Sequence, residues 1–408
     1  MKYYTPSLLL FLLLGCIGCN KQKPVEQMGA LLEIPLYSAE PTVLTNLSDV
    51  AAKVEFCNLS SEVSFKKKIP NDVALTDSFV FVLLDDGIYQ FASNGDFVRL
   101  IGQRGKGAGE FKRLMPPLEI DADNQICYVA DKGNQKIMGF NYDGTLNKEI
   151  PLRQLCVMNL VDSETFMLTP NFKDRFMLNA TLAKLINGKG EAIESIKSPI
   201  YPINKGNRKD SHYGAFYNPV WRYNDSVYTM EYGNDTIYKL VDKALIPDKV
   251  LTGTTYKPSL FHLFHSGMPD KVIVNSLFLR PNSAVCESDS FLMFRTKYAD
   301  GRYFMLYNKQ TGAIMRTDHP DAEIHEKRKQ RLSSYFIDDM LTGQDFEPVY
   351  QSGNKIIGLI SGYDLYDAKD QILEFVKANN HPQATTLTDV VSRCDLDDNP
   401  LLMIVTLK

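Results

Sequence analysis

A six-fold repeat constrains the fold of this chain more than any other feature of its sequence. The clearest copy covers residues 101–146, where short apolar runs such as Ile126–Asp131 and Lys136–Phe140 are separated by turns such as Tyr142–Gly144. Short apolar runs interrupted by Asp, Asn and Gly predict antiparallel strands joined by tight turns. Their return at a period of roughly 40 to 65 residues predicts blades that close radially into a propeller.

The predicted fold class is therefore all-β, a six-bladed β-propeller with two short helical insertions. The blade cores are expected at residues 78–101, 101–146, 156–196, 225–251, 289–316 and 353–360. The apolar segments Ala51–Cys57 and Leu401–Leu407 have no blade of their own, so we expect them to pair in the last blade and close the ring. Closure leaves no long exposed strand edge. A helix is predicted over Tyr363–Asn379 because of its apolar spacing. A second helix is expected over roughly Asp321–Leu341, in the connection from blade five to blade six.

Residues 1–19 predict an export signal. Lys2 supplies a positive start, and the apolar run Leu8–Leu14 is too short to span a bilayer. Small Gly residues precede Cys16 and Cys19, a pattern that resembles the lipobox of bacterial lipoproteins, in which the cysteine is acylated. The segment Leu13–Cys16 fits the lipobox better than the second cysteine does. The alternative is a cleavable secretory signal with incidental cysteines.

The chain is expected to divide into three regions: the signal at 1–19, a tether at 20–43 and the propeller at 44–408. The tether is polar and proline-containing, with only Leu31–Pro35 as a weak strand candidate. Acyl chains on a cysteine would hold the protein at a membrane surface without a transmembrane helix. The membrane is thus an expected partner through the lipid anchor.

Charge and cysteine content exclude several classes of function. The net charge is −4 and the isoelectric point is near 5.9, with no basic stripe, so nucleic acid is not an expected partner. Beyond the signal, the chain has five irregularly spaced cysteines and no C-x-x-C motif, which favours neither a disulfide framework nor a structural zinc site. Cys127 lies inside a strand pattern and is expected to be buried as a small apolar residue.

The second repeat resembles the NHL repeat in its Gly-Glu-Phe111 lead, in Val129–Asp131, in Gly133-Asn134 and in Asp143-Gly144. Together with the lipobox, the whole chain resembles the six-bladed propeller lipoproteins of gut anaerobes. This resemblance implies a fold and an envelope location rather than an activity. Exterior-facing lipoproteins of such bacteria tend to carry acidic residues after the lipidated cysteine. Here Asn20–Lys23 is basic, which favours a periplasm-facing anchor.

Strand parity predicts where loops gather. In a blade whose strands are named a to d from the channel outwards, the b–c turns and the d–a connections share one face. Arg104, Lys106 and the turn from Asp131 to Asn134 should therefore lie, with residues 199–217, at one mouth of the channel, where loops commonly bind ligands. In the alternative, Asp131 and Asn134 only bond their own turn. The glycines of 102–109 match no phosphate-binding motif and indicate a backbone turn.

Aromatic and basic side chains suggest a second set of binding residues. His212, Tyr213, Trp221 and Arg222 suit stacking on a sugar or peptide together with hydrogen bonding. Trp221 has the alternative of filling space between blades three and four. The pair His262/His265 has the spacing of a metal-binding helix, but no acidic residue accompanies it.

Two functions remain open. The first is a non-catalytic binding or scaffold lipoprotein that uses the channel mouth to hold a glycan, peptide or protein, with no cofactor. No nucleophile elbow, zinc-peptidase motif or other catalytic set is present in the sequence, so no catalytic residue is assigned. The alternative is a metal-dependent hydrolase or lyase of the lactonase-like propeller type. It would use calcium or zinc held by residues from several blades.

Overall fold

The structure is a computed structural model of the full chain. It describes residues 31–36, 42–44, 46–107, 109–152, 156–170, 181–197, 218–231, 234–253, 273–274, 285–298, 301–317, 324–325, 330–331, 336–379 and 381–408. Residues 32–408 belong to one compact unit.

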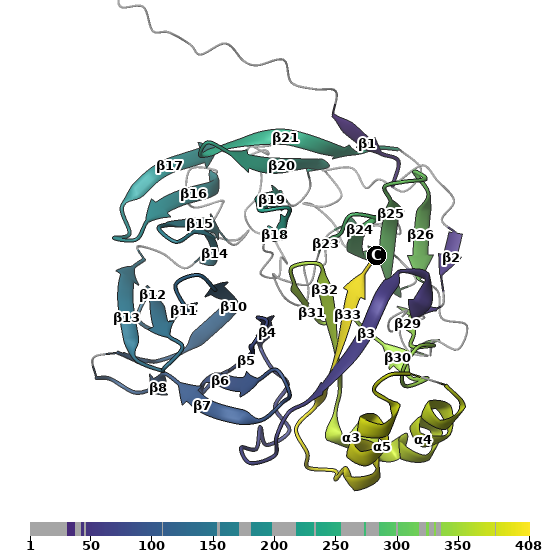
Figure 1. The fold of residues 1–408 in the computed structure, drawn as a ribbon. Coiled ribbons are helices and arrows are strands. Elements are labelled where there is room, and N and C mark those ends of the chain that lie inside the picture. The colour runs from purple at the N-terminus through teal and green to yellow at the C-terminus, as the bar shows by residue number, and fades with distance from the viewer. Residues whose placement is uncertain are drawn as a thin grey trace, which may run out of the picture. The chain divides into compact units, whose positions relative to one another are not determined.

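Six sheets stand radially around a centre and form a six-bladed propeller, as predicted (Figure 1). Each of the first three blades is one four-stranded antiparallel sheet in sequence order. Their strands are β4 (Asp72–Leu75), β5 (Phe79–Leu84), β6 (Gly87–Ala92) and β7 (Phe97–Ile101); β10 (Leu114–Asp121), β11 (Ile126–Asp131), β12 (Lys136–Asn141) and β13 (Leu146–Pro151); β14 (Cys156–Asp162), β15 (Thr165–Pro170), β16 (Thr181–Asn187) and β17 (Ala192–Lys197).

Blades four and five each receive an additional strand from the N-terminal segment. Blade four consists of β18 (Val220–Tyr223), β19 (Ser226–Met230), β20 (Thr236–Val241), β21 (Ala244–Leu251) and the added β1 (Leu32–Ile34). Blade five consists of β22 (Ile273–Val274) and β23 (Val285–Glu287), which both pair with β24 (Phe291–Tyr298), then β25 (Gly301–Asn308), β26 (Ile314–Thr317) and the added β2 (Thr42–Leu44). These additions pair in parallel with the outermost strands β21 and β26.

Part of the expected tether therefore belongs to the propeller. The weak strand candidate Leu31–Pro35 contains β1, and both Ile34 and the following Leu36 are buried. The added strands cover hydrogen-bonding edges that blades four and five would otherwise expose.

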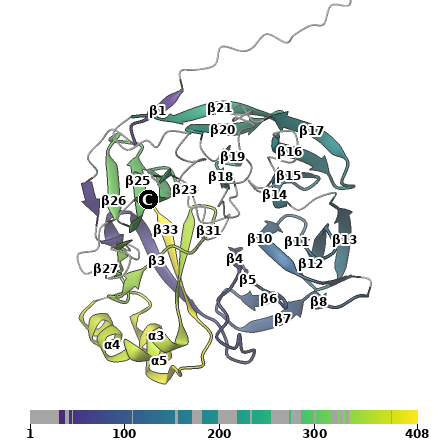
Figure 2. The same ribbon diagram turned by 180° about the vertical axis from the view of Figure 1, so that it is seen from behind.

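The first and last strands of the ring pair, as predicted. Blade six consists of β31 (Tyr350–Ser352), β32 (Lys355–Ile360), β33 (Leu401–Leu407) and β3 (Ala51–Asn58). Strand β33 lies between β32 and β3, and Val54 is directly opposite Val405 in an antiparallel register. Figure 2 shows the same closure from behind. Segments far apart in the sequence thus form one ladder that shuts the ring.

Apolar runs in the b strands place the core between blades. All six residues of β11 are buried, since a b strand is covered by a neighbouring blade on each face. Phe81, Phe111 and Phe140 belong to one buried cluster shared by blades one and two. Cys127 is buried in the same cluster, which confirms its expected apolar role. All five cysteines of the described segments are buried free thiols.

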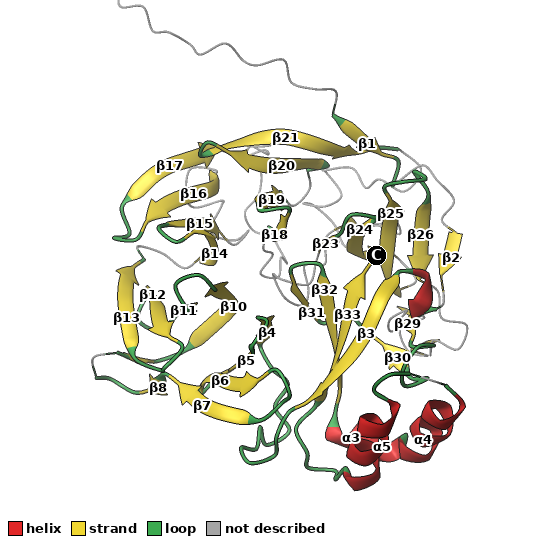
Figure 3. Ribbon diagram, viewed as in Figure 1, coloured by secondary structure: helices red, strands yellow, loops and turns green. Residues whose placement is uncertain are grey.

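The helical insertions match the predicted ones only in part. The helix expected over Tyr363–Asn379 is present as α3 (Gly362–Asp367) and α4 (Lys369–Ala378), and a third helix, α5 (Ala384–Arg393), was not predicted (Figure 3). Leu387 and Val391 on α5 are buried against the core of blade six. None of the helices in the described segments has the length and apolarity needed to cross a bilayer.

The helix predicted over Asp321–Leu341 is wrong where the structure describes it. That part of the chain contains the short pairs β27 (Ile324–His325) with β28 (Gln330–Arg331) and β29 (Phe336–Ile337) with β30 (Asp345–Phe346). Phe336 is fully buried, and the Asp338 carboxylate accepts three backbone N–H bonds, from residues 340, 341 and 342. Core packing and this carboxylate-held turn therefore override helix propensity. A short 3-10 helix, Leu47–Asp49, precedes β3, and β8 (Gln103–Arg104) pairs with β9 (Glu110–Phe111).

Candidate binding site in the central channel

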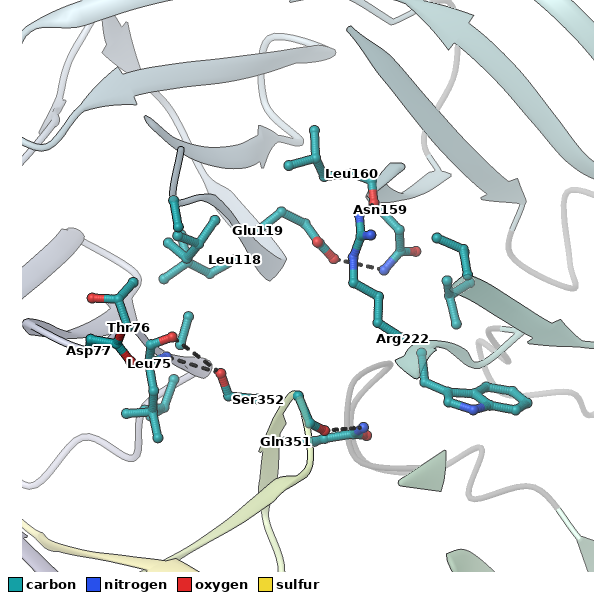
Figure 4. Close-up of a pocket in the computed structure, with 18 residues that line it drawn as sticks. Leu75, Thr76, Asp77, Leu118, Glu119, Asn159, Leu160, Arg222, Gln351 and Ser352 are labelled. Carbon is teal, nitrogen blue, oxygen red and sulfur yellow. Dashed lines mark hydrogen bonds between the residues drawn. The ribbon is translucent and has the colours of Figure 1, made fainter. Parts of the chain in front are cut away.

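The channel contains a pocket of about 330 Å³. Its walls come from the innermost strands of five blades, namely β4, β10, β14, β18 and β31, from the turns that follow them, and from Val227 on β19 (Figure 4). Contributions from five blades mean that only the closed ring assembles this pocket.

The pocket lies towards the face that carries the a–b turns. Most lining residues lie along the a strands and in the turns that follow them, for example Thr76-Asp77 and Ser352-Gly353. Because strands alternate in direction, the b–c turns and d–a connections lie on the opposite face. The binding mouth predicted from the sequence is on that opposite face. The pocket that the described residues line is therefore not at the predicted mouth.

Three polar side chains from three blades meet on the pocket wall: Glu119 on β10, Asn159 on β14 and Arg222 on β18 (Figure 4). The Asn159 amide nitrogen donates to Glu119 Oε1 at 2.9 Å. The Arg222 guanidinium donates to the carbonyl of Leu160 and, at 3.1 Å, to that of Val161. Arg222 thereby bridges blade four to blade three.

Burial raises the pKa of the Glu119 carboxyl above its ordinary value. The positive charge of Arg222 opposes this rise in pKa, and so does the hydrogen bond from Asn159. Two opposed influences therefore act on one carboxyl at the pocket wall. A carboxyl that burial and a charged partner perturb inside a cleft is typical of functional sites.

Asn159 has an unused acceptor. The residue is 5% exposed, and its Oδ1 has no hydrogen-bond partner among the described residues. A buried acceptor without a partner costs free energy, which a ligand that donates a hydrogen bond would recover. A binding role would explain why this acceptor is unsatisfied.

The opposite wall joins blades six and one. The Ser352 hydroxyl accepts a hydrogen bond from the backbone N–H of Leu75 at 3.2 Å, and the Gln351 amide donates to the carbonyl of Gly353. Leu118, Val220 and Val227 add apolar surface to the lining. The pocket therefore combines apolar surface with a small number of polar groups, as small-molecule sites generally do.

Trp221 contributes to the lining, but its ring is held by other protein groups. It is 4% exposed, stacks on Tyr228 with ring centroids 5.7 Å apart, and donates its indole N–H to Glu287 at 2.9 Å. Glu287 in turn forms ion pairs with Lys309 at 2.9 Å and with Lys249 at 3.3 Å. Trp221 thus packs between blades four and five, rather than between blades three and four.

A second hollow of about 470 Å³ lies beside the first. It shares Arg222 and Gly353 with the pocket and extends past the a–b turns of blades four, five and six to Asp289 and Lys408. Tyr223 donates to the Asp289 carboxylate at 2.9 Å at its edge. The a–b face is therefore hollow across neighbouring blades.

Asp131 acts within its turn in this structure. Its buried carboxylate accepts backbone N–H bonds from Lys112, Arg113 and Gly133, and a side-chain bond from Asn134 at 2.6 Å. Asp131 therefore ties the b–c turn of blade two to the preceding d–a connection, and the shared face of these loops agrees with strand parity. Its oxygens are occupied by the protein.

Arg104 and Lys106 are exposed at the outer rim rather than at the channel mouth. They belong to the loop around β8, which lies between the outermost strands β7 and β13 (Figures 1 and 2). Gly109 in this loop faces the Leu146 side chain of β13. The connection between blades one and two, which contains β8 and β9, folds outwards over the blade edges. Strand parity predicts the face on which a connection lies but not its distance from the channel.

Several predicted residues lie outside the described part of the chain: Cys16, Cys19, His212, Tyr213, His262 and His265. Of the predicted binding residues that the structure describes, Trp221 and Arg222 line the pocket. Glu119 and Asn159 were missed. They lie 40 residues apart in different blades, and neither belongs to a recognisable motif.

Among the described residues, no three His, Cys, Asp or Glu side chains gather closely enough to hold a metal ion. The metal-dependent alternative stays a prediction.

Fold and site together define a six-bladed propeller with a hollow channel face. The chain belongs to the family described as a domain of unknown function, DUF4934, whose model matches residues 32–406. No curated protein matches the chain significantly.

Solved structures support the fold alone. A Bacteroides fragilis protein assigned as exported (BF0058) is 16% identical, with a TM-score of 0.63 over 91% of this chain and 99% of that one. A DUF4221 member from Bacteroides vulgatus is 13% identical, with a TM-score of 0.45 over 88% of this chain and 97% of that one. Virginiamycin B lyase from Staphylococcus aureus is 14% identical, with a TM-score of 0.38 over 66% and 76%. The last two likenesses are too distant to support an argument.

Proposed function

We propose that this protein is a non-catalytic binding or scaffold protein of the cell envelope that holds a glycan, peptide or protein segment at the a–b face of its channel. The observation that carries the proposal is the pocket wall formed by Glu119, Asn159 and Arg222. Three blades supply these polar groups to one point, and one buried acceptor among them has no partner among the described residues. The adjoining second hollow gives room for a ligand longer than one unit.

A thermal-shift screen of the whole chain in mild detergent tests this binding function. A ligand that binds only the native state must raise the melting temperature as its concentration rises. We expect a glycan or peptide to do so, and Asn159→Leu to reduce the shift. A screen in which no ligand stabilises the protein, or one in which Asn159→Leu responds like the wild type, would contradict the proposal.

The same proposal includes export and a lipid anchor that faces the periplasm. It is supported by the lipobox-like sequence at Leu13–Cys16, by the NHL-like repeat, and by the likeness to a Bacteroides protein assigned as exported. Growth with an alkyne-labelled fatty acid should label the wild-type protein. Cys16→Ser should abolish labelling, whereas Cys19→Ser should retain it. An unlabelled wild-type protein would exclude the anchor.

A further inference from the structure

We infer that the channel pocket takes a neutral, hydroxyl-rich ligand, a single sugar ring, in preference to a charged one. This inference rests on the proposed binding function and adds the class of ligand. It follows from charge balance, from the available hydrogen-bonding atoms and from the size of the pocket.

Charge balance favours a neutral ligand. The charged side chains among the described lining residues are Asp77, Glu119 and Arg222, and Asp77 is exposed in its turn. Within the pocket, the acidic Glu119 and the basic Arg222 are each other's charge partners, because the Arg222 charge acts directly on the Glu119 carboxyl. An additional buried charge on a ligand would lose its hydration without gaining a free counter-charge, which is costly.

The hydrogen-bonding groups favour hydroxyls. Asn159 Oδ1 is a buried acceptor without a partner among the described residues, so a ligand group that meets it at this wall has to be a donor. Arg222 uses one terminal nitrogen for the carbonyls of Leu160 and Val161, and a guanidinium carries five N–H donors in total. The wall that carries the Asn159 acceptor therefore also carries a residue with several N–H donors. A hydroxyl donates and accepts at once, whereas an amide N–H only donates.

The size and the remaining walls fit one ring. A volume of about 330 Å³ is at the lower end of the range for small-molecule sites. Leu118, Val220 and Val227 provide apolar surface for the C–H face of a sugar, while the polar wall provides for its edge. A longer glycan would continue into the second hollow, which shares Arg222 with the pocket.

Ligand-observed NMR titration of the whole chain tests the inference with three neutral hexoses, glucose, galactose and mannose, and with the uronate and hexosamine of each. We expect at least one hexose to bind about tenfold or more tightly than its uronate and its hexosamine, because the charged forms lack a counter-charge in the pocket. Asn159→Leu should weaken hexose binding by about tenfold, the loss expected when a buried hydrogen bond to the ligand is removed. Asn147→Leu, on the exposed outermost strand β13, is the matched control and should bind like the wild type.

Glu119→Gln provides the second variant. It keeps the shape of the side chain but leaves the Arg222 charge uncancelled, so uronate binding should strengthen relative to hexose binding. Hexoses that bind no more tightly than their charged forms, or a Glu119→Gln variant with unchanged preference, would overturn the inference. Absence of hexose binding also overturns it. In that case, Asn159-dependent binding of a blocked neutral tripeptide would leave the proposed binding function standing, and absence of both would overturn the two proposals together.

Discussion

At the scale of single residues, single carboxylates such as those of Asp131 and Asp338 accept several backbone hydrogen bonds and so stabilise the conformation of a loop. Asp131 accepts four hydrogen bonds from two loops. We expect Asp131→Ala to lower the free energy of unfolding by about 2–4 kcal/mol, since several bonds to a buried charged group are lost together. Urea unfolding followed by circular dichroism measures this change.

Asn134→Ala provides the comparison, because Asn134 is exposed and gives the cluster a single side-chain bond. It should cost about 1 kcal/mol or less. Equal losses for the two variants would show that the Asp131 backbone bonds contribute little. Because the carboxylate is occupied within the protein, neither change should alter ligand affinity beyond its effect on folding.

Glu119 predicts a pH dependence. Its pKa is raised in the folded state by burial, so the folded protein binds a proton more readily than the unfolded chain. The contribution of Glu119 to stability is therefore fully present below the ordinary glutamate pKa near 4.5 and is lost as the pH rises through the raised value. The free energy of unfolding of the wild type should fall with pH in this window relative to Glu119→Gln. Urea unfolding at a series of pH values would contradict this if the two proteins keep a constant difference.

Residue types alone found half of the candidate site. Trp221 and Arg222 attract attention in any sequence because they are large and form directed contacts. Glu119 and Asn159 do not, since each lies in an ordinary strand and becomes a site residue only when distant blades meet. Asp131 drew attention for binding, although its turn uses both of its oxygens.

At the scale of elements, the packing of helix α4 against the turn that contains Gly343 should depend on the absence of a side chain at this glycine. Gly343 has a φ of +72°, and a Cβ there would lie 2.6 Å from the ring of Phe375 on α4. Gly353 has a φ of +61° with open space around it. Both alanine variants should lose about 1–2 kcal/mol from the left-handed backbone. Gly343→Ala should lose about 1 kcal/mol more through overpacking. Thermal unfolding measures the stability of the two variants. An equal loss of stability would show that α4 shifts to accommodate the added Cβ without a measurable cost.

Strands were easier to predict than helices here, for a physical reason. A blade strand is specified locally by alternating apolar residues and turn-forming Gly, Asn and Asp, as in β11 and β12. The segment from 321 to 341 contains helix-forming Glu, Lys and Arg, yet Phe336 enters the core and Asp338 closes a turn. That outcome depends on contacts with the rest of the molecule, which local propensity does not contain.

At the scale of the whole molecule, the N-terminal segment should stabilise the ring. Ile34 on β1 is fully buried between blades four and five, whereas its neighbour Leu32 is 42% exposed. Ile34→Ala should cost about 3 kcal/mol of unfolding free energy through loss of core packing. Leu32→Ala should stay within about 0.5 kcal/mol. If urea unfolding gives Ile34→Ala the same free energy of unfolding as the wild type, the N-terminal segment does not contribute to the propeller.

Ring closure was predictable because the chain has two apolar end segments and one incomplete blade. The face of the binding site was not. Strand parity sorts the loops into two faces, but which face is hollow depends on the side chains that the a strands of five blades point into the channel. No local sequence pattern shows how these side chains from five blades combine.

Hydrogen–deuterium exchange of the whole chain, with and without a ligand found by the thermal-shift screen, tests the central claim that the ligand binds at the a–b face. Exchange should slow at Thr76-Asp77, at Ser352-Gly353 and around Asn159, which line the pocket. Slowing confined to the opposite face, for example to the turn from Asp131 to Asn134, would contradict the account.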